Sequence, residues 1–338
     1  MHIQQNISLK DHNTFGIAVN AKNFCEVNSI ADLKKATTLN GYPNYFIMGG
    51  GSNMLLTKDI DDLVLFINIK GIEVAWENED EVCLEVNAGE NWHRLVLWTL
   101  ERGYGGLENL SLIPGNTGTA PIQNIGAYGV ELKDVLESCK ALELATNEIK
   151  TFTKKECQFG YRDSYFKNDG KGKFIITSVR LKLTKRNHKL HVGYGAIVSE
   201  LQNNNISEPT IRDISNAVIA IRKSKLPDPK ELGNSGSFFK NPVVNGQEFH
   251  TFTKKYPQAP FYKISDDEYK IPAGWLIEQC GFKGKRYGDA GVHKNQALVL
   301  VNYGNASGRE IIDLAHNIIK TVFETFQITI SPEVNIIK

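Results

Sequence analysis

The chain has 338 residues, which is enough for more than one hydrophobic core, so we expect two or three domains. Its 39 Lys and Arg residues nearly balance 38 Asp and Glu residues, and the formal net charge is +1. No dense basic block occurs in the sequence. Because binding to phosphate backbones or membrane surfaces depends on clustered positive charge, we expect neither a nucleic acid nor a membrane as a partner.

The cysteines and the apolar segments indicate a reduced, cytoplasmic, globular protein. The five cysteines are scattered without a C-x-x-C pair, so we expect neither a disulfide framework nor a metal site. The segment MHIQQNISLKDHNTFGI lacks the charged-then-apolar pattern of a signal peptide. No apolar run is long enough to span a bilayer.

Hydrophobic periodicity predicts helices and strands in alternation along the first hundred residues. A helix is expected after Ser29, with Asp32 as its capping partner three residues later. Strands are expected at 61–69 and 81–89, and a helix from about Asn91 to the terminating Gly103. In the second strand, alternation separates two sets of side chains: Val82, Leu84 and Val86 on one face, and Cys83, Glu85 and Asn87 on the other.

The rest of the chain continues this pattern. Further strands are expected at 140–144, 173–183 and 295–303. Ser307 and Glu310 cap an amphipathic helix, whose apolar face is formed by Ile311, Leu314, Ile318, Val322 and Phe326. Polar, proline-bearing joints at 200–210 and 224–236 suggest domain boundaries. We place boundaries near residues 70 and 215, which gives an α+β architecture with three lobes at 1–70, 71–215 and 216–327.

A glycine cluster follows the apolar segment 45–48 and consists of Gly49, Gly50, Gly51, Ser52 and Asn53. Consecutive small residues can expose backbone N–H groups in a concave nest that suits a pyrophosphate. A P-loop is excluded because Met54 and two leucines follow where Lys and Ser or Thr are needed. A Rossmann fingerprint is excluded because position 54 is not glycine and a strand follows. A tight hairpin turn remains the alternative.

A second cluster, Leu112–Gly129, is rich in glycine and nearly free of charge. Such a segment makes a poor solvated loop but a good lining for a large, flat, partly apolar ligand. Side-chain amides at 123 and 124 can satisfy the ligand's polar edges. The two clusters together suggest a dinucleotide cofactor held outside the Rossmann plan, with these candidate contacts in the second cluster: Pro114, Gly115, Gly118, Gln123, Asn124, Ile125, Gly126 and Ala127.

The stretch GNSGSFFKNP places Ser237 in a glycine-flanked turn before Phe238 and Phe239. Glycine permits close backbone approach, and the two aromatic side chains are expected to anchor the following residues in a core. This combination predicts a rigidly held hydroxyl group at the rim of a pocket. A flexible turn is the alternative.

Seven segments occur in an order that resembles the UDP-N-acetylenolpyruvoylglucosamine reductase family: NTFGI, GGGSN, ENLSLIPGNTGTAPIQNIGAYG, FGYRDSYFK, KLPDPKELGNSGSFFKNP, AGWLIEQCGFKG and ISPEVNII. The resemblance spans essentially the whole chain. The GYG around Tyr194 and the insert before AGWLIEQ resemble the longer of two subtypes, and Thr119 departs from a more usual alanine. The resemblance implies an FAD-binding pair of lobes of the vanillyl-alcohol-oxidase type and a third, substrate-binding lobe. It also implies that residues 328–338 return to the first lobe.

The implied reaction reduces an enolpyruvyl ether, with NADPH as the hydride source, FAD as the carrier and UDP-N-acetylglucosamine enolpyruvate as the substrate. By resemblance, Ser237 is the proton donor, while Arg162 and Glu333 stabilise the negative charge. Taken alone, Arg162 beside Asp163 would be a surface ion pair. Glu333 would be a solvated strand end, unless partial desolvation raises its pKa.

The resemblance also implies a set of substrate-binding residues: Tyr128, Tyr194, Lys225, Asn241 and Gln296. Lys225 lies on a stiff, proline-bearing joint and suits a diphosphate or carboxylate, although a solvated linker lysine is the default for such a position. We expect a monomer.

Two other functions remain open. One is a different FAD-dependent oxidoreductase of the same fold, which would not bind UDP-sugars. The other is a non-catalytic protein that binds a UDP-sugar or a flavin. The presence of Ser237, Arg162 and Glu333 argues against the second alternative, because a binding protein has no need of a proton donor.

Overall fold

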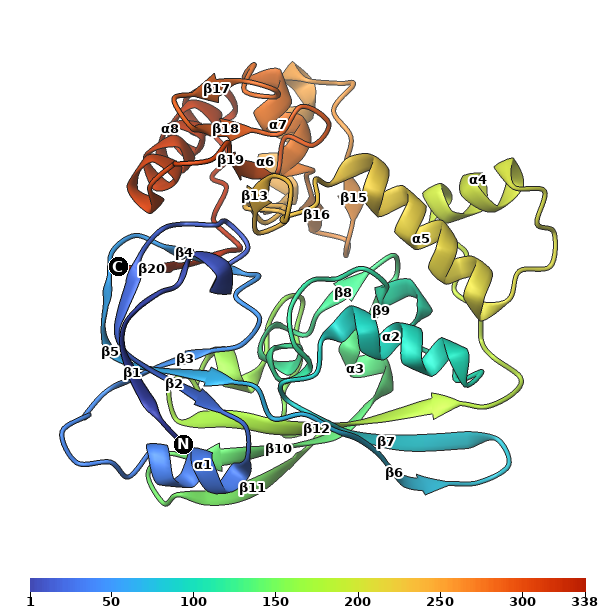
Figure 1. Ribbon diagram of the computed structural model, residues 1–338. Helices are drawn as coiled ribbons and strands as arrows, with labels where there is room; N and C mark the ends of the chain where they lie inside the picture. The colour runs from blue at the N-terminus through green and yellow to red at the C-terminus, as the bar shows by residue number, and fades with distance from the viewer. The chain divides into compact units, whose positions relative to one another are not determined.

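The computed structural model describes residues 1–338, which form two compact units (Figure 1). Unit 1 comprises residues 1–7, 21–50 and 60–222, and unit 2 comprises residues 8–20, 51–59 and 223–338. The three predicted domains at 1–70, 71–215 and 216–327 remain a prediction. None of the helices is long and apolar enough to cross a membrane.

The first sheet of unit 1 has four strands in the order β1-β2-β5-β3. The strands are β1 (Ile3–Ser8), β2 (Asn20–Val27), β3 (Tyr45–Met48) and β5 (Ile60–Ile67). Both β2 and β3 run parallel to β5. Helix α1 (Ile30–Ala36) begins as predicted, because the Asp32 N–H donates to the Ser29 hydroxyl over 3.0 Å.

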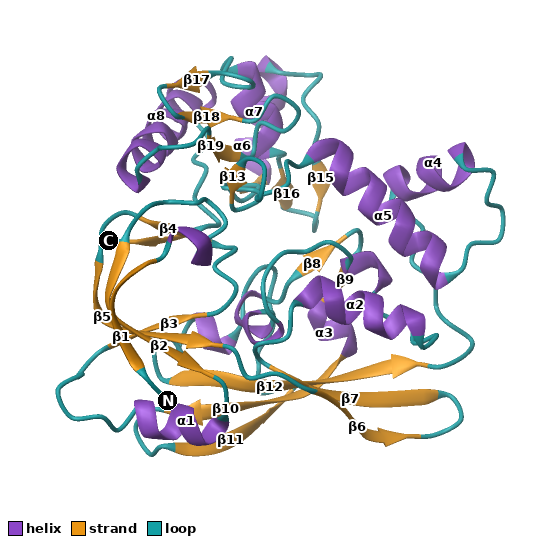
Figure 2. Cartoon of the chain, in the orientation of Figure 1, coloured by secondary structure: helices purple, strands orange, loops and turns teal.

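The second sheet of unit 1 is antiparallel, with the order β11-β10-β12-β7-β6 (Figure 2). Its strands are β6 (Ile72–Glu77), β7 (Glu81–Asn87), β10 (Leu136–Glu143), β11 (Glu148–Thr153) and β12 (Phe174–Thr184). Helix α2 (Trp92–Glu101) begins after the predicted Asn91 cap and contributes Trp92 and Leu95 to the core of this sheet. On the sheet's other side, Leu142 and Ile175 pack with residues of the first sheet.

In β7 the expected alternation is accompanied by burial on both faces at its centre, because Cys83 is buried like Val82 and Leu84. The Cys83 thiol lies 3.1 Å from the Glu137 carboxylate of β10, which helps to cover this position. Burial, followed by the hydrogen bond to Glu137, raises the pKa of the Cys83 thiol to about 12.

Unit 1 ends in helices that the sequence analysis did not predict. Helices α4 (Gly195–Asn203) and α5 (Ile211–Lys225) pack together through Ile197, Ile214 and Val218. Helix α5 continues without a break through residue 215. A short helix, α3 (Leu132–Val135), and the two-stranded pair β8 (Gly126–Ala127) and β9 (Val130–Glu131) precede β10.

Unit 2 contains two small antiparallel sheets and three helices. One sheet has the order β13-β19-β18-β17, with β13 (Gly233–Asn234), β17 (Arg286–Tyr287), β18 (Ala290–Val292) and β19 (Leu300–Asn302). The other has the order β14-β16-β15, with β14 (Val243–Asn245), β15 (Tyr262–Lys263) and β16 (Glu268–Lys270). The helices are α6 (Gly246–Lys255), α7 (Ala273–Gln279) and α8 (Gly308–Phe326).

Helix α8 confirms the last helix prediction. Ser307 and Glu310 form the expected capping box, and the apolar face predicted from the sequence is buried. Of the strand expected at 295–303, only residues 300–302 form a strand, which is β19. At the end of the chain, β20 (Asn335–Ile337) pairs in parallel with β4 (Met54–Leu56).

Candidate active site

The glycine cluster at 49–53 is not a hairpin turn. The strand before it, β3, pairs with β5, whereas the strand after it, β4, pairs with β20. A β-carbon on Gly50 would lie 2.9 Å from the Cα atom of Gly115, and one on Gly49 would lie 2.6 Å from the Cγ2 atom of Thr119. The two glycine-rich segments therefore contact each other within unit 1, and glycine at position 50 is required by the backbone of position 115.

The second half of the cluster, residues 51–53, belongs to unit 2 and is hydrogen-bonded to the segments that contain Thr14 and Asn335. Gly51 has a φ of +61°, and its carbonyl accepts hydrogen bonds from the N–H and the hydroxyl group of Thr14. The carbonyl of Asn53 accepts from the backbone N–H of Asn335 over 3.1 Å and from its side chain over 2.8 Å. Ser52, between them, is partly exposed.

The loop from Pro114 to Gly118 is fixed to the end of β7 and the start of α2. The N–H of Gly118 donates to the carbonyl of Ala88 over 2.9 Å, and the Trp92 N–H donates to the carbonyl of Gly115 over 3.0 Å. A β-carbon on Gly118 would lie 2.5 Å from the β-carbon of Ala88. This glycine therefore serves packing inside the protein, while Pro114 is exposed at the rim of the loop.

Asn124 is buried in the left-handed region, with a φ of +43°. Its Nδ2 group donates to the Glu131 carboxylate and to the Gly160 carbonyl, and its Oδ1 atom accepts from the N–H of Lys133. The sequence suggested that this amide contacts a ligand, but these three bonds occupy it within the protein. Gln123 and Ala127, on either side, are partly exposed, and Ile125 is buried.

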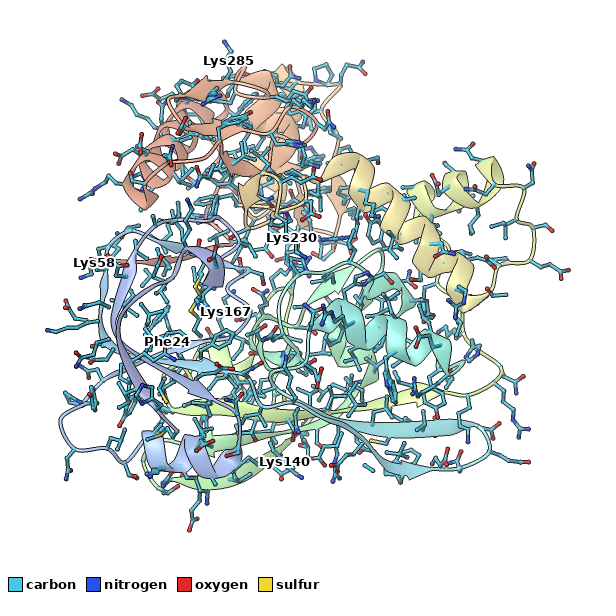
Figure 3. The ribbon with its side chains drawn as sticks, in the orientation of Figure 1. Phe24, Lys58, Lys140, Lys167, Lys230 and Lys285 are labelled. Carbon is cyan, nitrogen blue, oxygen red and sulfur yellow. The ribbon has the colours of Figure 1, made fainter.

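Arg162 lies at the tip of a two-residue turn closed by backbone hydrogen bonds between Gly160 and Asp163. Its φ of +54° is unusual for a residue with a β-carbon. Lys167, labelled in Figure 3, donates from its ammonium group to the carbonyl of Arg162 over 3.1 Å. The Arg162 Nη2 group donates to the carbonyl of Gly126 over 2.6 Å. A β-carbon on Gly126 would lie 2.9 Å from the Cγ atom of Glu131, 3.0 Å from Nη1 of Arg162 and 3.1 Å from the carbonyl of Val130, so glycine gives the guanidinium its room at this position.

Tyr128 occupies a second strained turn, between β8 and β9. Tyr128 and Gly129 have φ values of +51° and +83°, as in the primed turns that connect twisted hairpins. The side chain of Asn109 donates to the carbonyl of Tyr128 over 3.0 Å and to that of His191 over 2.8 Å. The ring of Tyr128 meets the ring of Tyr194 edge-on, with their centroids 5.2 Å apart. Unit 1 thus brings Arg162, Tyr128 and Tyr194 to one region.

Ser237 and Glu333 are joined through the backbone of Phe238 in unit 2. The Phe238 N–H donates to the carbonyl of Leu298, and its carbonyl accepts from the N–H of Glu333, each over 2.7 Å. Phe238 and Phe239 are fully buried, as the sequence predicted. Gly236 precedes the serine with a φ of +68°, and its N–H donates to the Asn234 side chain. The turn is therefore held on both sides, and the Ser237 side chain remains partly exposed.

The other predicted substrate-binding residues also lie in unit 2. Lys225 is exposed at the end of α5, and Gln296 is partly exposed, with its Oε1 atom accepting from the Leu298 N–H. The Oδ1 atom of Asn241 accepts from the Ala273 N–H over 2.9 Å, which directs the amide nitrogen away from α7.

The sequence analysis did not single out two buried polar residues, Asn109 in unit 1 and His293 in unit 2. Asn109 holds the Tyr128 turn, and His293 forms a hydrogen bond with the Lys225 backbone. The pKa of His293 is lowered, mainly by burial and to a smaller extent by the positive charge of Lys294. For Asn109 the available signal was the alternation of polar and apolar residues in ENLSLIP, where Glu108 and Ser111 are buried as well.

Comparison with known proteins gives matches along the whole chain. An FAD binding domain family matches residues 21–153, and the C-terminal domain family of UDP-N-acetylenolpyruvoylglucosamine reductase matches residues 228–337. The UDP-N-acetylenolpyruvoylglucosamine reductase of Flavobacterium johnsoniae is 62% identical over 337 residues, which cover 100% of both chains. That of Chromobacterium violaceum is 47% identical over 339 residues and covers 98% of each.

A solved structure agrees with these sequence matches. The crystal structure of UDP-N-acetylenolpyruvylglucosamine reductase from Thermus caldophilus aligns over 100% of both chains, with a TM-score of 0.71 and 25% identity. The α+β fold with an FAD-binding part and a further domain, expected from the sequence, is therefore confirmed.

Proposed function

Because the chain belongs to the UDP-N-acetylenolpyruvoylglucosamine reductase family, we propose that it reduces UDP-N-acetylglucosamine enolpyruvate to UDP-N-acetylmuramate, a precursor of peptidoglycan. The observation that carries this proposal is the high identity to a curated reductase over the full length of both chains. The FAD binding domain match makes FAD the cofactor.

The residues of unit 1 fit a flavin dinucleotide. Gly50 packs against the backbone of Gly115 and the side-chain oxygen of Asn116, and Gly49 packs against the Thr119 side chain, so glycine lets these two segments come close together. Closely packed small residues of this kind can expose backbone N–H groups that suit a pyrophosphate. Gly51, Ser52 and Asn53, which belong to unit 2, are proposed as further cofactor contacts. Further contacts would come from the partly exposed residues Gln123, Gly126 and Ala127. When bound, FAD supplies a group that accepts and donates a hydride.

The chain's own residues then handle charge and protons. Hydride arrival at the methylene carbon of the enol ether leaves negative charge on the carbon next to the carboxylate. The guanidinium of Arg162, held by Gly126 and Lys167, stabilises that charge, because it is permanently cationic and forks onto carboxylates. Glu333 is the second residue that acts on this charge, in the role that the family resemblance gives it.

Ser237 donates the proton that completes the reduction. A serine is a weak acid in water, but the enolate is strongly basic and the hydroxyl is positioned in advance by the fixed turn around Phe238. Tyr128, Tyr194, Lys225, Asn241 and Gln296 bind the sugar nucleotide. Of these, Lys225 supplies positive charge for the diphosphate.

Several finer features belong to the same proposal. NADPH supplies the hydride, and the enzyme works as a monomer in the cytoplasm, where its nucleotide substrates are made. We assign the chain to the longer subtype of the family because of the GYG around Tyr194 and the insert before AGWLIEQ, a part of the chain in which α6, β15 and β16 lie.

The test is a pair of half-reactions with the purified protein. We expect a flavin spectrum, bleaching of that spectrum by NADPH without oxygen, and its return when UDP-N-acetylglucosamine enolpyruvate is added. UDP-N-acetylglucosamine, which lacks the enol ether, is the matched control and should not restore the spectrum. NADH in place of NADPH tests the choice of nicotinamide. A colourless protein, or a bleached flavin that the enolpyruvyl compound leaves unchanged, refutes the proposal.

A further inference from the structure

Arg222 is a buried cation whose hydrogen bonds are incomplete. It lies near the C-terminal end of α5, the long yellow helix of Figure 1. Its side chain is partly exposed overall, but the Nε group is buried and has no hydrogen-bond partner. Guanidinium groups are rarely buried with a donor unused, because an unsatisfied charged donor costs more than the about 1–3 kcal/mol of a neutral one.

The groups around Arg222 do not neutralise it. The phenol of Tyr128 forms a hydrogen bond with the guanidinium, and Arg162 lies close enough to act on it electrostatically. Burial lowers the pKa of Arg222 most, Tyr128 raises it, and the positive charge of Arg162 lowers it further. The positive charge of Arg162 thus acts on Arg222 in a partly desolvated region, where like charges disfavour each other more than they do in water.

The surrounding backbone is built to hold this arrangement. Tyr128 stands in a left-handed turn that Asn109 clamps, and Arg162 stands in another that Lys167 clamps. The Ser111 hydroxyl lies 2.7 Å from that of Ser215, which ties the segment before this loop to α5. Left-handed residues with a β-carbon cost about 1–2 kcal/mol each, and such strain persists where the surrounding structure fixes a functional geometry.

We infer that Arg222 is an anion-binding residue that acts beside Arg162 on the negative charge of the reaction. This inference rests on the proposed function and extends it, since the family resemblance gave this role to Arg162. The ligand is a planar, delocalised anion, which a guanidinium fork matches through two parallel N–H donors. Two sources share this chemistry: the carboxylate of the enolpyruvyl substrate, and the pyrimidine end of the reduced flavin ring, which carries negative charge.

The test uses Arg222→Met, which keeps an apolar stem, and Arg222→Lys, which keeps the charge but loses the fork. Lys223→Met removes one positive charge from an exposed neighbour on the same helix and is the matched control. Flavin content and Tm of each variant show whether it is folded. Two readouts follow: the dissociation constant of UDP-N-acetylglucosamine enolpyruvate for the oxidised protein, and the midpoint potential of the bound flavin.

If the anion is the substrate carboxylate, Arg222→Met weakens substrate binding at least tenfold and leaves the potential unchanged. If it is the reduced flavin, binding is unchanged and the reduced form loses about tenfold in relative stability, which lowers the potential by about 30 mV for a two-electron couple. Arg222→Lys should fall between the parent and Arg222→Met in the affected readout. The inference is overturned if folded Arg222→Met matches Lys223→Met in both readouts. If Arg222→Met does not fold, the same comparison is made with Arg222→Lys. Turnover by the parent protein tests the proposed function separately.

Discussion

Replacing Ser237 by alanine should separate proton donation from every other step. The substitution removes one hydroxyl group from a turn whose backbone is held on both sides. Before the serine, the Gly236 N–H donates to the Asn234 side chain. After it, the backbone of Phe238 is hydrogen-bonded to Leu298 and Glu333. We therefore expect folding, FAD binding and reduction of the flavin by NADPH to survive. Reoxidation of the flavin by UDP-N-acetylglucosamine enolpyruvate should slow.

The size of the effect follows from the role of a positioned acid. General acid catalysis contributes about 10²–10⁴-fold, which corresponds to about 2.7–5.4 kcal/mol of the barrier. Stability should change by no more than about 0.5 kcal/mol, since the Ser237 side chain is partly exposed and both neighbouring backbone segments keep their hydrogen bonds. Ser237→Cys keeps a donor in nearly the same place and should recover part of the rate.

Ser235, two residues earlier, provides the matched control. Its buried hydroxyl lies 3.2 Å from the Thr14 hydroxyl and donates to the Met54 carbonyl over 3.2 Å. Ser235→Ala should therefore lose about 1–2 kcal/mol of stability and keep the reoxidation rate, the opposite pattern to Ser237→Ala. Stopped-flow absorbance of each half-reaction and thermal unfolding of each variant measure the two effects. If Ser237→Ala reoxidises at the parent rate, the serine is only a turn residue and the proposed mechanism fails.

Three further substitutions test the binding surfaces. Gly50→Val should release FAD and lower Tm, because its β-carbon would already lie 2.9 Å from the Gly115 backbone, and a parent-like flavin content would contradict this. Gly126→Val should displace the Arg162 guanidinium and lower the flavin content. The fraction of the protein that still binds FAD should reoxidise slowly. A yellow variant with parent kinetics would refute this prediction. Lys225→Ala should raise KM for the sugar nucleotide and spare reduction by NADPH, whereas equal damage to both half-reactions would assign Lys225 to the cofactor or to the fold.

Local signals in the sequence predicted the elements whose ends are set by their own side chains. Ser29, Asn91 and Ser307 each cap the helix that was expected after them. Cys83 shows the limit of this reasoning, because its burial comes from Glu137 on another strand and not from its own alternation pattern. Helix α5 was missed for a related reason: its apolar residues are interrupted by charges and begin directly after a proline-bearing joint.

The sequence marked the two glycine clusters as segments where backbone comes close to another group. It did not show that, at some of these glycines, the neighbouring group belongs to the protein itself. Composition suggested that backbone approaches a ligand at Gly50 and Gly118. In the structure, these glycines admit the backbone of Gly115 and the side chain of Ala88. These contacts join segments 65 and 30 residues apart and depend on the tertiary fold, so a sequence pattern can mark the need for glycine without identifying the neighbour.

The side-chain positions of the candidate site depend most on features that sequence does not encode locally. Asn124, Tyr128 and Arg162 all adopt left-handed backbone conformations, although none is a glycine. Asn124 is fixed by Gly160 and Tyr128 by Asn109, which are distant in the sequence, whereas Arg162 is fixed by Lys167, five residues later.

Glycine would remove the strain at any of these three positions, but it would also remove the side chain. The strain at Tyr128 and Arg162 is therefore explained by where the phenol and the guanidinium must be held, next to Arg222. At Asn124 it is explained by the three hydrogen bonds that fix the loop carrying Gly126. Since Gly126 in turn supports Arg162, the strained positions form one chain of support that ends at the proposed anion-binding guanidinium groups.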